Sequence, residues 1–246
     1  MEPDFNVILQ KINCQFGERS FIVDAQTSEE ITYSHLISAA HLLGDYFSKV
    51  GLKRGQRIGI YLENCVEFVI LYFTCLFKGY IAVPINVDLH ENDVSYILEV
   101  AKLDLLIYSN NSEGLFKSIP EEIPPLIGIL EDNELIIDEY RFSKIREKVV
   151  LDPQSSEIKI DASDLCSLHF TSGTTARPKG VFHSASSLLT SALEFNKAVS
   201  MNHTDRIYHI FSMAYMAGFL NTLICPFLAG GCVVLGKPFT ARTAQI

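Results

Sequence analysis

Segments with the periodicity of a helix alternate with short apolar runs along this chain, and this alternation constrains the fold more than any other feature. Apolar residues recur at helical spacing in residues 34–50, 65–78, 91–100 and 184–199. Short apolar runs that are typical of buried strands lie at residues 57–62, 81–85, 105–108, 126–130, 165–170, 181–183, 207–211 and 232–235. Strands that are joined through helices pair in parallel, so the pattern predicts an α/β fold with mainly parallel sheets flanked by helices.

Residues 109–161 are the least regular part of the sequence. Pro120, Pro124, Pro125 and Pro153 interrupt it, and proline is unfavourable inside helices and central strands. Two interpretations stay open for this segment. It connects two lobes, or it carries a strand and a short helix at residues 139–149.

Size and charge exclude several classes of function. The chain has 246 residues, of which 48% are apolar and 20% are charged, so it can form one large domain or two small ones. The formal net charge is −9, and the acidic side chains gather between Glu113 and Glu157, a pattern typical of a solvated face. No stripe of Lys and Arg is available to neutralise a nucleic-acid backbone, so we expect no DNA or RNA partner.

The sequence indicates a cytoplasmic protein without a membrane span. None of the six cysteines belongs to a C-x-x-C pair, and we expect neither a zinc site nor disulfides. No signal-peptide pattern follows Met1. Residues 207–236 contain no Asp, Glu, Lys or Arg, but Pro226 and the Gly230–Gly231 pair interrupt them. These interruptions favour a buried helix, turn and strand over a transmembrane helix.

The segment between Leu168 and Gly180 carries the clearest chemical signal. A predicted strand ends there in a loop of hydroxyl-bearing residues with one glycine and one lysine: Thr171, Ser172, Gly173, Thr174, Thr175 and Lys179. Small residues leave backbone N–H groups free to point at one anion, and lysine adds a positive charge. The combination favours a polyphosphate ligand, although the spacing is not that of a P-loop. A solvated turn rich in Ser and Thr is the alternative interpretation.

The order of residues in this loop closely resembles the phosphate-binding signature of the adenylate-forming superfamily, which includes acyl-CoA synthetases, adenylation domains of peptide synthetases, and luciferases. Four other segments resemble further motifs of the superfamily, in the same order: 31–36, 76–86, 211–218 and 229–235. The resemblance therefore extends over nearly the whole chain. It implies the large N-terminal domain of such an enzyme, incomplete here, with a first lobe at residues 1–160 and the start of a second lobe, carrying the phosphate loop, at residues 161–246.

The resemblance implies an ATP-dependent, AMP-forming ligase that joins a carboxylate to a thiol. The carboxylate attacks the α-phosphate of ATP, giving an acyl-adenylate and pyrophosphate, and the thiol of coenzyme A or of a carrier-protein pantetheine then captures the acyl group. Residues 171–175 would wrap the β- and γ-phosphates, Lys179 would neutralise the leaving pyrophosphate, and Mg²⁺ is expected beside them. Tyr215 and Gly218 fall in the segment that lines the acyl or aryl pocket.

Details of that segment narrow the expected substrate. No Asp lies between Phe211 and Leu235, where amino-acid-activating members carry an acid for the substrate ammonium group, so the resemblance favours a fatty or aryl carboxylate. Tyr215 stands where acyl- and aryl-CoA ligases often place a residue that gates the acyl tunnel. A core tyrosine on a buried helix is an equal alternative. An amino-acid or acyl-carrier-protein adenylation domain is the other possibility within the superfamily.

Later motifs of the superfamily do not occur in these residues. The chain contains neither Tyr-Gly-x-Thr-Glu nor Thr-Gly-Asp, which in the superfamily would bind adenine, Mg²⁺ and ribose, and the resemblance implies that these residues do not include the C-terminal catalytic domain. We therefore expect the N-terminal part of a longer enzyme, with its catalytic residues beyond Ile246. These 246 residues alone are expected not to complete adenylation. The alternative is a non-catalytic nucleotide-binding remnant that keeps the phosphate loop.

Overall fold

A computed structural model describes the chain at residues 5–117, 126–138, 140–143, 145–146, 161–171 and 177–236. Its helices are α1 (Phe5–Phe16), α2 (Tyr33–Lys49), α3 (Val66–Lys78), α4 (Glu91–Ala101), α5 (Glu113–Lys117), α6 (Ala185–Val199), α7 (Cys225–Ala229), the short 3₁₀ helix η1 (Asn110–Ser112) and the π-helix η2 (Ala217–Ile224). Its strands are β1 (Ser20–Asp24), β2 (Glu30–Thr32), β3 (Arg57–Tyr61), β4 (Ile81–Pro84), β5 (Leu105–Ser109), β6 (Leu126–Glu131), β7 (Glu134–Ile137), β8 (Tyr140–Phe142), β9 (Leu165–Thr171), β10 (Lys179–Ser184), β11 (Arg206–His209) and β12 (Cys232–Leu235).

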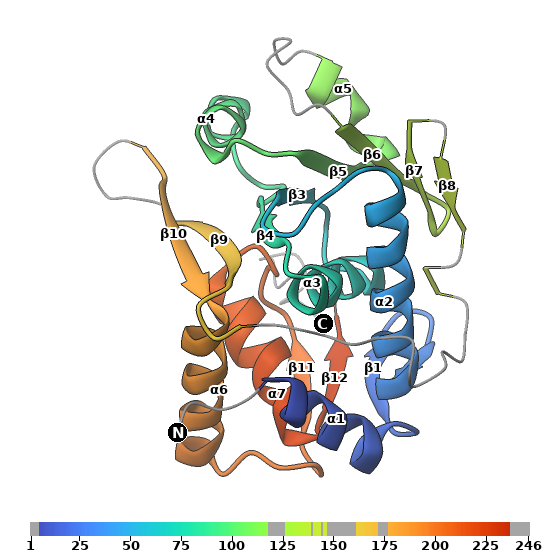
Figure 1. The fold of residues 1–246 in the computed structure, drawn as a ribbon, viewed down its shortest axis with the longest axis vertical. Coiled ribbons are helices and arrows are strands. Elements are labelled where there is room, and N and C mark those ends of the chain that lie inside the picture. The colour runs from blue at the N-terminus through green and yellow to red at the C-terminus, as the bar shows by residue number, and fades with distance from the viewer. Residues whose placement is uncertain are drawn as a thin grey trace, which may run out of the picture.

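These strands form two sheets with helices packed against them (Figure 1). The larger sheet has the order β10-β9-β4-β3-β5-β6-β7-β8 and is parallel from β9 to β6, with antiparallel strands at both ends. The smaller sheet has the order β11-β12-β1-β2, and only its β1–β2 pair is antiparallel. The α/β class with mainly parallel sheets is therefore confirmed.

The two sheets do not correspond to the lobes expected at residues 1–160 and 161–246. β9 and β10 join the larger sheet beside β4, while β1 and β2 join the smaller sheet beside β12. Parallel strands are joined by long crossover connections, so strands that are neighbours in a sheet need not be consecutive in the chain. Residue 160 is thus not a boundary between the sheets, and as a boundary between lobes it stays a prediction.

The predicted elements match the structure wherever the apolar pattern is long. The four predicted helices correspond to α2, α3, α4 and α6 within one residue at each end. One interpretation of residues 109–161 includes a helix at residues 139–149. For the described residues of that range this prediction is wrong, because residues 140–142 form β8. The strand expected at residues 207–211 ends at His209. The strands β1 and β2 have patterns too brief to stand out in the sequence, whereas α1 has 12 residues and is missing from the predicted helices despite its length.

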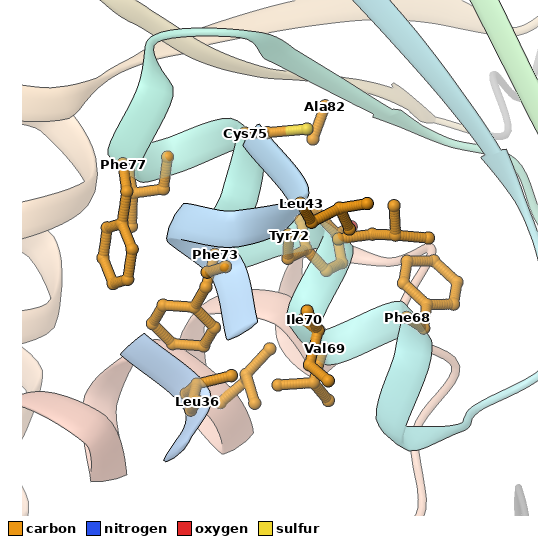
Figure 2. Close-up of a cluster of buried hydrophobic side chains, with 14 of the residues drawn as sticks. Leu36, Leu43, Phe68, Val69, Ile70, Tyr72, Phe73, Cys75, Phe77 and Ala82 are labelled. Atoms are coloured by element: carbon orange, nitrogen blue, oxygen red, sulfur yellow. The ribbon is translucent and has the colours of Figure 1, made fainter. Parts of the chain in front are cut away.

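Helix α3 is buried on every side and forms the centre of the core. Every residue from Val66 to Phe77 is buried, as expected for a helix that is apolar all round. Figure 2 shows its side chains packed against Leu36 and Leu43 of α2, with Cys75 beside Ala82 of β4. The helix begins where the Cys65 Sγ atom accepts a hydrogen bond from the Phe68 N–H, and it ends at Gly79, whose left-handed φ of 71° favours glycine.

Tyr33 connects the N-terminal segment to the far end of the described chain. Its hydroxyl donates a hydrogen bond of 2.6 Å to the carbonyl of Gly231, and its ring stacks on Phe227 at a centroid distance of 5.3 Å. Burial raises the pKa of Tyr33 well above its usual range, so the hydroxyl stays a donor. Two of the motif-like segments, 31–36 and 229–235, are thus in direct contact.

A buried ion pair joins α3 to the segment after β8. The guanidinium of Arg146 forms a bidentate pair with the Glu67 carboxylate and donates a further bond of 2.6 Å to Glu29. The Glu67 side chain is only 3% exposed and the Arg146 side chain 21%. A carboxylate this deeply buried requires its partner, because removal of one member leaves a charge without solvation.

We expect Arg146→Met to destabilise the fold by about 3 kcal/mol, because it leaves the Glu67 carboxylate buried and unpaired. Arg141→Met is the matched control, because Arg141 is 66% exposed in its pair with Glu134 and should change stability by less than about 0.5 kcal/mol. Urea unfolding monitored by circular dichroism measures both free energies. Equal losses in the two variants would contradict the assignment.

Two buried histidines are held in the neutral form. Burial, with a contribution from Lys78, lowers the pKa of His41 to about 4, and burial, with a contribution from His183, lowers that of His169 to about 4. His169 packs against the rings of Tyr72 and Phe219, which also stack on each other, and neither of its ring nitrogens has a hydrogen-bond partner in the described chain. His169 is therefore a packed histidine of the core.

The free energy of unfolding should fall as the pH drops from about 6.5 to about 4. In this range His169 binds a proton in the unfolded chain, whereas the buried His169 of the folded chain stays neutral. His169→Phe should remove a pH-dependent loss on the order of 3 kcal/mol across this window. The exposed His90→Phe variant is the control and should keep the wild-type slope. Denaturant titrations at a series of pH values give the slopes, and an unchanged slope in His169→Phe would disprove the effect.

Within the residues that the structure describes, no helix is both long enough and apolar enough to cross a bilayer. The uncharged stretch at residues 207–236 instead comprises the end of β11, η2, α7 and β12. Its predicted helix, turn and strand are thus present. Part of the helical portion is a π-helix, which the sequence pattern does not reveal.

Candidate functional site

The candidate site lies where two neighbouring strands of the larger sheet end. β4 and β9 are parallel and adjacent, with Ala82 opposite Ser167, so their carboxyl ends reach the same edge. β9 ends at Thr171, and the chain after β4 continues to Asn86. Ligands of open α/β sheets bind at such edges, beyond the carboxyl ends of the strands.

The β9–β10 hairpin holds the two ends of the predicted phosphate loop together. Thr171 and Lys179 are opposite each other in the register, and the Thr171 hydroxyl donates a bond of 3.4 Å to the Lys179 carbonyl. Lys179 is exposed, and its ammonium group has no ion pair with a described residue. The predicted ligand residues Ser172, Gly173, Thr174 and Thr175 lie outside the described residues. Figure 1 shows this hairpin at the edge of the sheet beside β4.

A cavity of about 170 Å³ opens at the base of this hairpin. It brings together the end of β9, the start of β10, the turn after β4, one face of α4 and the segment before η2. Its polar lining comes from Asn86, Asp93, Thr171, Arg177 and Tyr215. Its apolar lining comes from Pro84, Ile85, Leu89, Ile97, Phe170, Pro178 and Ala214.

Tyr215 lines this cavity and is not a core residue. Its side chain is 44% exposed, it precedes η2, and the Asn86 side-chain amide donates a hydrogen bond of 3.0 Å to its hydroxyl. The alternative of a core tyrosine on a buried helix is therefore wrong. A role for Tyr215 in substrate binding stays a prediction, now with a cavity beside it.

Gly218 does not line the cavity, and its visible role is structural. A Cβ atom at this position would lie 2.3 Å from the carbonyl oxygen of Ser212, so a larger residue cannot fit without moving the backbone. Glycine thereby lets the first turn of η2 pack closely on the segment that carries Tyr215. Any contact of Gly218 with a substrate stays a prediction.

Arg177 contributes a cation to the cavity lining. Its guanidinium lies 5.0 Å from the centroid of the Tyr96 ring on α4, within the range of a cation–π interaction. The resemblance places Arg177 at a variable position of the motif, where a solvated arginine is expected more often than a ligand. The structure instead places it against the aromatic face and in the cavity wall.

Three residues that hold the Tyr215 segment have no signal strong enough to identify them from the sequence. They are Asn64, Tyr72 and Asn86, which form side-chain hydrogen bonds to residues 211–215. Asn64 and Asn86 follow the buried strands β3 and β4 closely. A polar residue just beyond a buried parallel strand is the one pattern that could have indicated them.

The described residues include no cluster of three His, Cys, Asp or Glu side chains that could hold a metal ion. Asp93 is the one acidic residue in the cavity lining. The described chain therefore offers cations and hydroxyls for an anion, which fits a polyphosphate. The expected Mg²⁺ has no ligand set here and stays a prediction.

Solved structures share this fold. Anthranilate CoA ligase AuaEII in complex with anthranoyl-AMP superposes with a TM-score of 0.84 at 23% identity, covering 99% of this chain and 46% of that chain. The N-terminal domain of FACL13 from Mycobacterium tuberculosis superposes with a TM-score of 0.81 at 22% identity, covering 99% of this chain and 59% of that chain. At these identities the likeness establishes the fold alone.

Curated relatives and a family model identify the family of the chain. The long-chain-fatty-acid–CoA ligase FadD13 of Mycobacterium tuberculosis is 26% identical over 219 residues, which are 89% of this chain and 42% of that protein. The crotonobetaine/carnitine–CoA ligase of Salmonella enteritidis is 27% identical over 222 residues, which are 87% of this chain and 42% of that protein. The chain thus spans about two-fifths of the length of these relatives. Because the model of the AMP-binding enzymes matches residues 9–246, the chain belongs to the AMP-binding enzyme family.

Proposed function

We propose that the full-length protein is an ATP-dependent, AMP-forming ligase that joins a small carboxylate to the thiol of coenzyme A. One observation carries the proposal: residues at the two ends of the phosphate loop, Thr171 and Arg177, line a cavity that Tyr215 also lines. A polyphosphate held by the loop and a carboxylate held in the cavity would be neighbours. The names of the curated relatives, both CoA ligases, support this reaction class.

The charges of the site support ATP as the co-substrate. The chain carries a formal net charge of −9, so a polyanion needs local cations. Lys179 supplies one without a competing ion pair in the described chain, and Arg177 supplies another that Tyr96 holds in the cavity wall. Mg²⁺ would then bind mainly through phosphate oxygens and water, as it does in other nucleotide sites.

The proposed reaction has two balanced steps. A carboxylate oxygen forms a bond to the α-phosphorus of ATP, the bond from that phosphorus to the bridging oxygen breaks, and pyrophosphate leaves with the electron pair. The thiol then gives its proton to water and its sulfur bonds to the acyl carbon, while the bond from that carbon to the phosphate oxygen breaks and AMP leaves with the electron pair. Lys179 and the loop hydroxyls would stabilise the charge that develops on pyrophosphate, while the cavity residues would orient the carboxylate.

The cavity supports an acyl or aryl carboxylate as the substrate class. Most of its lining residues are apolar, and its volume of about 170 Å³ suits a short chain or a single ring within the described part of the site. Asp93 is the observation that favours a second candidate, an amino-substituted carboxylate, because its carboxylate could pair with a substrate cation. The thiol of a carrier protein is the alternative to coenzyme A as the acceptor, and a cytoplasmic location is a further part of the proposal.

Lys179→Met should lower kcat/KM for ATP by about 100-fold in the full-length protein, the size expected when one charge-stabilising group is lost from a transition state. The assay is the carboxylate-dependent exchange of labelled pyrophosphate into ATP, run with a panel of fatty, aryl and amino acids. Lys197→Met is the matched control, because Lys197 lies on α6 in an exposed pair with Glu194 and should leave the rate unchanged.

A second measurement uses the 246-residue chain itself. Calorimetric titration with inorganic pyrophosphate should detect binding that Lys179→Met weakens and Lys197→Met does not. If no carboxylate in the panel supports exchange in the full-length protein, the proposed function is wrong. If exchange occurs but both lysine variants behave alike, the assignment of Lys179 to the phosphate site is wrong.

A further inference from the structure

Side chains from the first part of the chain hold the segment that carries Tyr215 in place. The Asn64 side chain donates a bond of 2.6 Å to the Phe211 carbonyl and accepts one of 2.9 Å from the Met213 N–H. The Tyr72 hydroxyl donates a bond of 2.8 Å to the Met213 carbonyl. The backbone before Tyr215 is thus fixed by two residues that lie more than 100 positions earlier in the chain.

Asn86 forms a hydrogen bond to the side chain of Tyr215, whereas Asn64 and Tyr72 bond to the backbone of the preceding residues. Its Nδ2 group donates to the Tyr215 hydroxyl at 3.0 Å, and its Oδ1 atom accepts from the Asp88 N–H at 3.2 Å. Its own carbonyl accepts from the Leu89 N–H at 3.2 Å, and the residue is only 8% exposed. Asn86 is therefore a rigid donor whose position is set by the turn after β4.

Without the hydrogen bond from Asn86, the Tyr215 side chain could rotate although its backbone is held in place. Its N–H donates to the Ser212 carbonyl at 3.1 Å, and its carbonyl accepts from the Phe219 N–H at 2.9 Å, so the main chain is held. The ring itself is 44% exposed at the cavity, and an exposed tyrosine samples several rotamers. The Asn86 amide is the described group that selects one of them.

We propose that Asn86 is a positioning residue that fixes the Tyr215 ring in the cavity wall and thereby determines which carboxylates the enzyme accepts. This inference rests on the proposed function, because it assigns a source of selectivity to the same cavity. Both residues line that cavity together with Thr171. A ring held in one rotamer gives a wall of fixed shape, whereas a mobile ring lets the cavity adapt to longer or bulkier acids.

The test is a double-mutant cycle with Asn86→Ala, Tyr215→Phe and the double variant in the full-length protein. The readout is the ratio of kcat/KM for octanoate to kcat/KM for benzoate in the pyrophosphate exchange assay. Each single variant should change this ratio by about five-fold, the effect of losing one hydrogen bond. The double variant should change it no further, because both substitutions remove the same bond. The KM for ATP should stay within two-fold.

A second readout observes the ring directly and needs no activity. The 246-residue chain is labelled with 3-fluorotyrosine, and the ¹⁹F resonance of Tyr215 is identified by its loss in Tyr215→Phe. Asn86→Ala should shift this resonance toward that of free 3-fluorotyrosine. Asn196→Ala is the matched control, because Asn196 is a buried asparagine that bonds to the Cys225 carbonyl, and it should leave the resonance in place.

Several results would overturn the inference. They are an additive change of the ratio in the double variant, a parallel rise in KM for ATP, or an unchanged ¹⁹F resonance in Asn86→Ala. If Asn86→Ala does not fold, Tyr215→Phe carries the test alone, since it keeps Asn86 and its turn, and an unchanged ratio then overturns the inference. Failure of the proposed function is distinct, because the wild-type protein would then show no exchange with any carboxylate.

Discussion

The complete burial of α3 is the constraint on which the rest of the structure depends. A helix with no solvent face must be covered on all sides, so both sheets and their helices have to pack around it. Phe73 contacts Phe21 of the smaller sheet and Phe227 of α7, while Tyr72 stacks on His169 of β9 in the larger sheet. One helix thereby fixes how the two sheets lie relative to each other.

The candidate site follows from that packing. Tyr72 of α3 and Asn64, just before α3, also hold the segment ahead of η2, so the helix that organises the core also positions the cavity wall. Another part of the lining comes from the end of β9 and the residues just before β10, and β9 is paired to β4 in the larger sheet. A substitution that shifts α3 would therefore also displace the segment ahead of η2, through the hydrogen bonds of Tyr72 and Asn64, even though no cavity residue is changed.

The local pattern of apolar residues predicts most helices and strands. Most features that it does not predict are contacts between residues far apart in the chain. Helices α2, α3, α4 and α6 and the strand before the loop are visible in the sequence, because periodicity is a property of neighbouring residues, although α1 is missed. The bond between Asn86 and Tyr215 joins residues 129 positions apart, and nothing local signals it. The same holds for the Arg146 pair with Glu67, and for the strands β1 and β2, which pair with β12 from the other end of the chain. Tyr215 itself was ambiguous because core and cavity tyrosines have the same local pattern.

The shared cavity wall has a consequence for how the two proposed ligand sites relate. Thr171 and Arg177 stand at the two ends of the loop, and both line the cavity that Tyr215 also lines. A ligand in the cavity would therefore lie beside Thr171 and Arg177, where the loop begins and ends. A reaction between a carboxylate and an α-phosphate requires this proximity, because the two reacting groups must be held about 3–3.5 Å apart. Selectivity for the acid and binding of the nucleotide are then properties of one piece of structure, built where β4 and β9 end side by side.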